Sequence, residues 1–227
     1  MKAPSRTVLL AVYRRLLAHF GPRHWWPARS PFEVAVGAIL TRNTAWTNVE
    51  QAIQQLRRAR ALSADTLARV SHGRLARWIR PAGYFNVKAR RLRAVVAWWV
   101  ARRDPVRTTR HQSLEMLRQE LLGVHGIGPE TADSILLYAL GRPSFVVDAY
   151  TKRVFARHGW ASRHARYEDL QQMLMTRLPR RVPLYNEYHA LIVELGKQLC
   201  RKRRPRYSIC PLRGLGVVRL EAGVVPA

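Results

Sequence analysis

The hydrophobic positions of this chain repeat with a helical period along almost its whole length. In the clearest case Val49, Ala52, Ile53 and Leu56 follow the i, i+3, i+4, i+7 spacing, with glutamine and arginine on the opposite face. The same period predicts further helices at residues 6–20, 64–71, 73–80, 86–102, 113–122, 130–140, 149–158, 167–177 and 183–200. Strand-like alternation is absent, and the apolar run at 144–147 is too short and isolated to form a sheet. The chain is predicted to be all-α.

One further helix has a clear N-terminal signal in the sequence. In SPFEVAVGAIL, Ser30 is a candidate N-cap, Pro31 fits the first helical position, and Glu33 is placed to close a capping box. We expect this apolar helix to begin at residue 31.

The net charge indicates the class of binding partner more clearly than the amino-acid composition does. Forty lysines and arginines against fourteen acids give a net charge of +26, spread along the chain, and such a field attracts polyanions, above all nucleic acid. A codon bias toward arginine with a solvated basic surface is the alternative, but it does not explain the scarcity of acids. A membrane role is disfavoured, because no run of eighteen apolar residues occurs. The N-terminus reads as an amphipathic helix without a small-residue cleavage site, so we expect a cytoplasmic protein.

A glycine-rich turn stands between two predicted helices in LLGVHGIGPETADSILLYAL. Gly126, Ile127 and Gly128 form the turn, its glycines are expected to permit positive φ, and Pro129 occupies the first position of the next helix. The amide groups at such a helix start can bind phosphate. An ordinary turn between packed helices is the alternative, but the basic composition favours the phosphate site.

Several motifs together resemble a known family. GIGPETAD, VVDAYTKRV, SPFEVAVGAILTRNTAWTNVEQAI, GYFNVKARRL and NEYHALIVELGKQLC occur in the order found in the helix-hairpin-helix DNA glycosylases related to endonuclease III. The resemblance covers residues 30–210. It implies a two-lobe helical fold, with a central lobe at 29–142, a second lobe at 1–28 plus 143–227, and a cleft between them.

The resemblance also implies a partner, double-stranded DNA containing a damaged base, bound by a monomer. The hairpin would grip the DNA backbone, and Arg42 and Asn43 fall where the family fills the gap left by a flipped base. Many relatives have Gln at the position of Arg42, which leaves the opposite-base preference open. Further DNA contacts are expected from Lys88, Lys152, Arg203 and Arg204.

Asp148 is the catalytic carboxylate that the resemblance implies. Breaking an N-glycosidic bond leaves positive charge on the deoxyribose, and an ionised carboxylate stabilises that charge and can align water. A plain N-cap for the helix that follows is the other interpretation, and the two are compatible.

Glu130 stands where bifunctional relatives carry a lysine that attacks the sugar and forms a Schiff base. A carboxylate cannot form that imine, so the sequence resembles a monofunctional glycosylase of the branch typified by 3-methyladenine DNA glycosylase III. Glu130 is thus a second candidate catalytic residue, in contact with the base. Its position in a first helical turn has an alternative cause, the helix dipole.

Tryptophans and cysteines complete the candidate chemistry. Trp25, Trp26 and Trp46 are expected to line a base pocket, where stacking and cation–π attraction would hold a cationic alkylated purine. Family members with an iron–sulfur cluster use four thiolates in a C-x6-C-x2-C-x5-C pattern. Only Cys200 and Cys210 of that pattern are present here, so we predict no cluster, no metal and no cofactor.

The sequence predicts a base-excision enzyme that hydrolyses the bond to a damaged base, in the first instance an alkylated purine such as 3-methyladenine, without lyase activity. Two alternatives stay open. One is a uracil or thymine glycosylase acting on mismatches, and the other is a DNA-binding protein that has kept the hairpin but lost catalysis.

Overall fold

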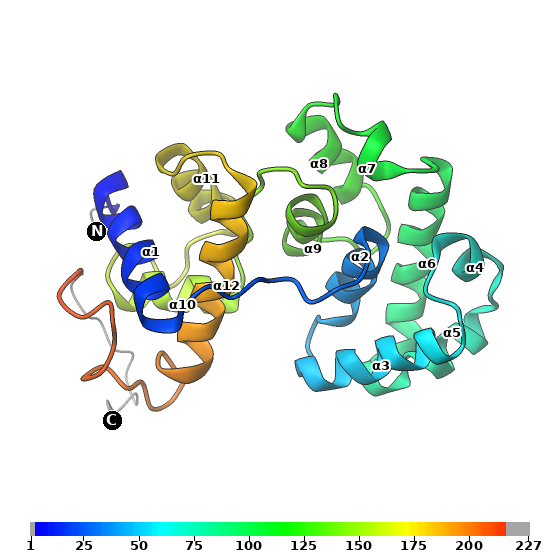
Figure 1. The fold of residues 1–227 in the computed structure, drawn as a ribbon, viewed down its shortest axis with the longest axis horizontal. Coiled ribbons are helices and arrows are strands. Elements are labelled where there is room, and N and C mark those ends of the chain that lie inside the picture. Colours follow the sequence, from blue (N-terminus) through cyan, green and yellow to red (C-terminus); the bar gives the residue numbers. More distant parts are fainter. Residues whose placement is uncertain (1–2, 217–227) are drawn as a thin grey trace. The chain divides into compact units, whose positions relative to one another are not determined.

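The computed structural model describes residues 3–216, and their regular elements are all helical (Figure 1). No strand occurs among these residues, which confirms the all-α prediction. The α-helices are joined by a 3-10 turn, η1, and a single π-helical turn, η2. In chain order the elements are α1 (Arg6–Phe20), α2 (Pro31–Leu40), α3 (Trp46–Arg58), α4 (Ala64–Arg69), α5 (His72–Trp78), η1 (Arg80–Ala82), α6 (Phe85–Ala101), α7 (Pro105–Thr108), α8 (Leu114–Leu122), α9 (Pro129–Ser134), η2 (Ile135–Ala139), α10 (Ala149–Arg157), α11 (Tyr167–Arg177) and α12 (Val182–Gln198).

The structure divides into two compact units. The central unit comprises residues 26–142, and the other comprises the residues up to 25 and from 143 onward. In the central unit, α4 and α5 pack against α6, and α2 packs against α6, α9 and η2 (Figure 1). In the other unit, α12 packs against α1 and α10. The sequence analysis placed the first boundary three residues later, between residues 28 and 29, and the second at the same place, between 142 and 143.

Helix α2 is the buried centre of the central unit. All residues from Phe32 to Leu40 are buried, as expected for a helix that is apolar on every side. Its start agrees with the sequence, since the hydroxyl of Ser30 accepts a hydrogen bond from the Glu33 amide at 3.2 Å. The predicted capping box is wrong in one respect: the buried Glu33 carboxylate forms an ion pair with Arg57 of α3. A carboxylate buried this deeply requires such a cation.

The apolar run before α10 is extended, although it belongs to no sheet. Phe145, Val146 and Val147 are buried. Side chains of α11 supply hydrogen bonds to their backbone: Gln171 donates to the Phe145 carbonyl at 2.7 Å, and the Val147 amide donates to the Tyr167 hydroxyl at 3.3 Å. Side chains of α11 thus satisfy backbone groups of this segment that a neighbouring strand would satisfy in a sheet.

Among the described residues, no helix is long and apolar enough to span a membrane.

Candidate active site

The glycine turn joins α8 to α9, and its two glycines differ. Gly126 has φ of 80°, and a Cβ added there would lie 2.3 Å from Cγ of Arg91. Glycine is required at this position for its conformation and for the close approach of Arg91. Gly128, in contrast, has φ of −99° and open space around its Cα. The expectation of positive φ was therefore right for Gly126 and wrong for Gly128. Between them, Ile127 turns its side chain into the core, leaving backbone at the surface.

Glu130, in the first turn of α9, forms an ion pair with Arg42. Arg42 lies in the turn that follows α2, and both side chains are partly exposed. The neighbouring Asn43 has φ of 54°, a left-handed conformation that asparagine tolerates better than most residues. The sequence had assigned Glu130 and Arg42 to separate tasks. The structure brings them together, so that the carboxylate is held by a cation within its own unit.

Asp148 is the N-cap of α10. Its Oδ1 accepts hydrogen bonds from the backbone amide of Thr151 at 2.7 Å and from the Thr151 hydroxyl at 2.9 Å. The N-cap interpretation is confirmed, and it fixes the carboxylate at the positive end of a helix. Only 14 % of the side chain is exposed.

His189 of α12 is the second partner of Asp148. Its Nε2 lies 3.7 Å from Oδ2 of Asp148, and its side chain is almost completely buried. Burial raises the pKa of Asp148, but the imidazole of His189 and the hydrogen bonds from Thr151 outweigh burial and hold that pKa below its usual value. Asp148 is therefore ionised at neutral pH. The sequence analysis had seen no role for His189, because residues forty-one positions apart show no local spacing.

Two of the three predicted pocket tryptophans lie together. The rings of Trp26 and Trp46 meet edge to face with centroids 5.5 Å apart, and Tyr138 packs against Trp26 at 5.3 Å. Gly37 leaves room for this cluster, since a Cβ there would lie 3.1 Å from the Trp26 ring. Trp25 belongs to the other unit, where the Lys197 ammonium lies 5.6 Å from its ring centroid. The aromatic cluster is thus Trp26, Trp46 and Tyr138, the last of which the sequence analysis missed.

Lys88 requires a correction, because it does not present its charge to DNA. The residue is buried, and its ammonium donates to the carbonyl oxygens of Leu40 at 2.8 Å and of Ala82 at 2.7 Å. It thereby ties the C-terminal end of α2, just before Arg42, to η1. The other predicted DNA contacts are at the surface: Arg203 and Arg204 are exposed, and Lys152 is partly exposed.

Metal ligands are sparse in the described part of the chain. No group of three or more histidines, cysteines, aspartates or glutamates there is placed to hold a metal ion. Both cysteines are free thiols, Cys200 buried and Cys210 partly buried. Burial raises the pKa of the Cys210 thiol above its ordinary value.

Comparison with known proteins identifies the family. A family model described as HhH-GPD superfamily base excision DNA repair protein matches residues 36–180, which include the hairpin, Glu130 and Asp148. The chain belongs to the HhH-GPD superfamily. This membership confirms the resemblance drawn from the motifs.

Three relatives illustrate the similarity. A protein of Methanocaldococcus jannaschii named as a DNA repair glycosylase is 45 % identical over 94 % of this chain and 97 % of its own length. The structure of the H. pylori 3-methyladenine DNA glycosylase MagIII, bound to 1,N6-ethenoadenine, is similar with a TM-score of 0.67 and 28 % identity, over 85 % of this chain and 97 % of that one. A non-covalent endonuclease III–DNA complex reaches a TM-score of 0.78 at 21 % identity, over 94 % and 95 % of the two chains.

Membership in the HhH-GPD superfamily gives the coarse activity of the chain. The chain is a DNA glycosylase of base excision repair, and DNA is its substrate. A glycosylase needs an anion to face the sugar cation, and the structure offers an ionised Asp148 at a helix end. It also needs a surface on which a base can stack, which the aromatic cluster can provide.

We expect His189 to act on excision through Asp148. Replacing His189 by leucine removes the positive or hydrogen-bonding group beside a nearly buried carboxylate, and should slow single-turnover excision on the order of 10-fold. The dissociation constant for DNA should change less than twofold. His189→Gln, which keeps an N–H at a similar reach, should retain most of the excision rate. Asp148→Asn provides the lowest rate, with which both variants are compared. Glutamine as slow as leucine would contradict this role.

Lys88 should make stability depend on pH. Burial, with the nearby charges of Arg91 and Arg42, lowers the pKa of Lys88 from 10.5 to about 8. The unfolded chain therefore binds this proton more tightly than the folded one, so the free energy of unfolding should rise between about pH 8 and pH 10.5. Urea unfolding of the wild type and of Lys88→Met at pH 7 and pH 10 checks this. The stability lost by the variant should be larger at pH 10, by on the order of 2 kcal/mol, whereas an equal loss at both pH values would contradict it.

Proposed function

We propose that this chain is a monofunctional DNA glycosylase that hydrolyses the N-glycosidic bond of an alkylated purine in duplex DNA and leaves an intact abasic strand. The observation that carries the proposal is the Arg42–Glu130 ion pair. It puts a neutralised carboxylate at the position where the bifunctional relatives carry a nucleophilic lysine. Without an amine there, the reaction ends at hydrolysis.

The chemistry assigned to Asp148 follows from its environment. As the bond between C1′ and the base nitrogen breaks, its electron pair leaves with the base, and positive charge develops on C1′ and the ring oxygen of the sugar. A carboxylate already ionised and fixed by Thr151 and His189 stabilises that charge without having to reorganise. A water molecule aligned by Asp148 then bonds to C1′ through its oxygen and releases its proton to the surrounding solvent.

An alkylated purine suits the aromatic cluster and Glu130 of the central unit. An N3- or N7-alkylated purine carries a positive charge and leaves as a neutral base, so the enzyme does not need to protonate it. Trp26, Trp46 and Tyr138 offer aromatic surface for a cation, and the Glu130 carboxylate could receive it in exchange for Arg42. The likeness to MagIII, a 3-methyladenine glycosylase captured with an adenine derivative, supports the same substrate class.

Monofunctional chemistry predicts the form of the product. The DNA strand should stay intact after excision and break only on treatment with alkali, and borohydride should trap no protein–DNA adduct. A high yield of adduct would contradict the proposal. In that event Lys152→Met tests the partly exposed lysine, because Lys88 is enclosed by Leu40 and Ala82.

A panel of lesions tests the substrate class. Duplexes containing 3-methyladenine or 7-methylguanine should be processed, and Asp148→Asn should lower their excision at least about 100-fold while DNA binding is kept, since it removes charge but little volume. Glu130→Gln should be milder and should affect cationic lesions more than neutral ones.

The control for this panel is Asp169→Asn, the same chemical change at an exposed residue of α11 that pairs with Arg166. It should leave excision unchanged. If uracil or thymine is removed from mismatches while both methylated purines are untouched, the mismatch activity replaces this proposal. If Asp148→Asn and the wild type are equally inert on every duplex, the protein is a DNA-binding relative without catalysis.

A further inference from the structure

The chain leaves α12 into a loop rich in positive charge. Residues 201–206, RKRRPR, are here called the basic loop. Its arginines and its lysine are all exposed, while Pro205 is buried. Five like charges in six residues repel one another, and such a run is ordinarily disordered. Something must therefore hold this loop in place.

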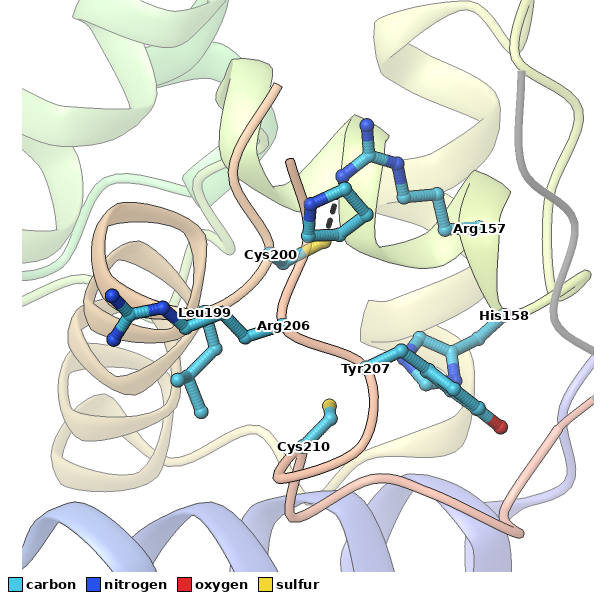
Figure 2. Close-up of a pocket in the computed structure, with 8 residues that line it drawn as sticks. Arg157, His158, Leu199, Cys200, Arg206, Tyr207 and Cys210 are labelled. Atoms are coloured by element: carbon cyan, nitrogen blue, oxygen red, sulfur yellow. Dashed lines mark hydrogen bonds between the residues drawn. The ribbon is translucent and has the colours of Figure 1, made fainter. Parts of the chain in front are cut away.

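In cluster-bearing relatives this part of the chain carries four thiolate ligands, but the residues here do not fit a cluster. Cys200 and Cys210 supply two sulfurs, and Tyr207 and Gly216 stand at the other two positions. Gly216 has no room for a cysteine, since a Cβ there would lie 2.4 Å from the carbonyl oxygen of His158. The cavity beside the cysteines measures about 20 Å³, space for roughly one water molecule (Figure 2).

Arg157, at the end of α10, lines the same cavity as the two cysteines. It is 4 % exposed, and its Nη1 lies 3.5 Å from the Cys200 sulfur, a contact drawn as a dashed line in Figure 2. Nη1 also donates to the carbonyl oxygen of Arg201 at 2.6 Å, and Nη2 donates to that of Lys202 at 2.7 Å. One guanidinium thus binds two successive carbonyls of the basic loop.

Arg153, one turn earlier on α10, extends the same arrangement. Its Nε donates to the Cys200 carbonyl at 2.8 Å, and its Nη2 donates to the Gly196 carbonyl at 3.0 Å. The two arginines together bind four backbone carbonyls between the last turn of α12 and the start of the basic loop. We call Arg153 and Arg157 the arginine clamp.

The clamp accounts for the outward orientation of the basic loop. Carbonyl oxygens of residues 201 and 202 turn inward to the guanidinium of Arg157, while the side chains of the loop are exposed. Burying a guanidinium is costly unless its donors are satisfied, and here the loop backbone supplies acceptors for Nη1 and Nη2, while Nε is buried without a hydrogen-bond partner among the described residues. The buried Arg157 therefore needs the loop carbonyls as acceptors, and the exposed side chains of the loop need Arg157 to hold their backbone in place.

We propose that Arg157, assisted by Arg153, is a positioning residue that preforms the basic loop as a contact for the DNA phosphate backbone, in place of a metal cluster. The inference rests on the DNA binding in the proposed function, but it does not depend on which base is excised. A fixed loop presents its charges without first having to be ordered, which lowers the entropic cost of binding.

The test measures affinity for an undamaged duplex at several salt concentrations. Each phosphate neutralised contributes about one log unit of affinity per log unit of salt. The Arg203→Met/Arg204→Met double variant should therefore lower the slope by about two. Arg157→Met, although it changes a buried residue, should lower both the affinity and the slope nearly as much. Arg157→Lys, which keeps the charge but not the forked geometry, should fall in between.

Arg166→Met is the matched control, because it removes the same charge from an exposed residue of the same unit. Its affinity should change less than about twofold. Combining Arg157→Met with the double variant should lower the affinity little further, since all three changes act on one contact. Trypsin, which cleaves after arginine and lysine, should cut residues 201–206 at least about 10-fold faster in Arg157→Met.

Several results would overturn the proposal. Arg157→Met could bind like Arg166→Met, or its effect could add fully to that of the double variant. Stoichiometric iron and sulfide, or zinc, in the purified wild type would give the loop another anchor. If Arg157→Met does not fold by circular dichroism, Arg157→Lys decides through its salt slope. Because undamaged DNA is used, a failure of the excision assays leaves this test intact.

Discussion

The need to keep Asp148 ionised while nearly buried constrains the structure around it. The other deeply buried acids are each paired with an arginine: Glu33 with Arg57, and Asp133 with Arg118 at 2.9 Å. An arginine beside Asp148 would also keep it ionised, but its permanent charge would cancel the field that a sugar cation should experience. Hydrogen bonds from Thr151 at a helix start, and an imidazole nitrogen 3.7 Å from Oδ2, stabilise the anion while leaving much of its field available. Residues 145–147, which are hydrogen-bonded to side chains of α11, lead directly to Asp148 at the start of α10.

The helices themselves could be predicted from the sequence, and physics explains why. Amphipathic periods and cap residues are local signals, so the ends of the predicted helices agree with the structure within two residues when α9 and η2 are taken together as the helix predicted at 130–140. Helix α7 and η1 were missed because four and three residues are too few to show a period. The position of Asp148 at a helix start and the glycine turn were also predicted, because each depends on a short stretch of sequence.

The partners of the site residues could not be predicted in this way. Glu130 forms an ion pair with Arg42, eighty-eight residues away, Asp148 lies beside His189, and Tyr138 packs against Trp26, which in turn meets Trp46. Each pairing is created by packing and leaves no spacing in the chain. Lys88 is a case in which the missing partner made the prediction wrong. A lysine in a basic sequence suggests a DNA contact, but the carbonyl groups of Leu40 at the end of α2 and of Ala82 in η1 bind its ammonium group. Pattern alone cannot distinguish a cation for phosphate from a cation for carbonyl oxygens.

That distinction refines what the high positive charge means. Several arginines bind backbone carbonyls at places where the chain leaves a helix: Arg142 binds those of Thr109 and Gln112 at 2.7 Å each, and Arg93 binds that of Val70 at 2.7 Å. Part of the basic composition is therefore structural. Neither a simple codon bias nor a purely DNA-binding surface explains these arginines. A carbonyl oxygen, however, satisfies a guanidinium without neutralising it. Every arginine used in this way still adds to the field around the protein, so the same side chains that fasten the loops also help to draw the protein toward DNA.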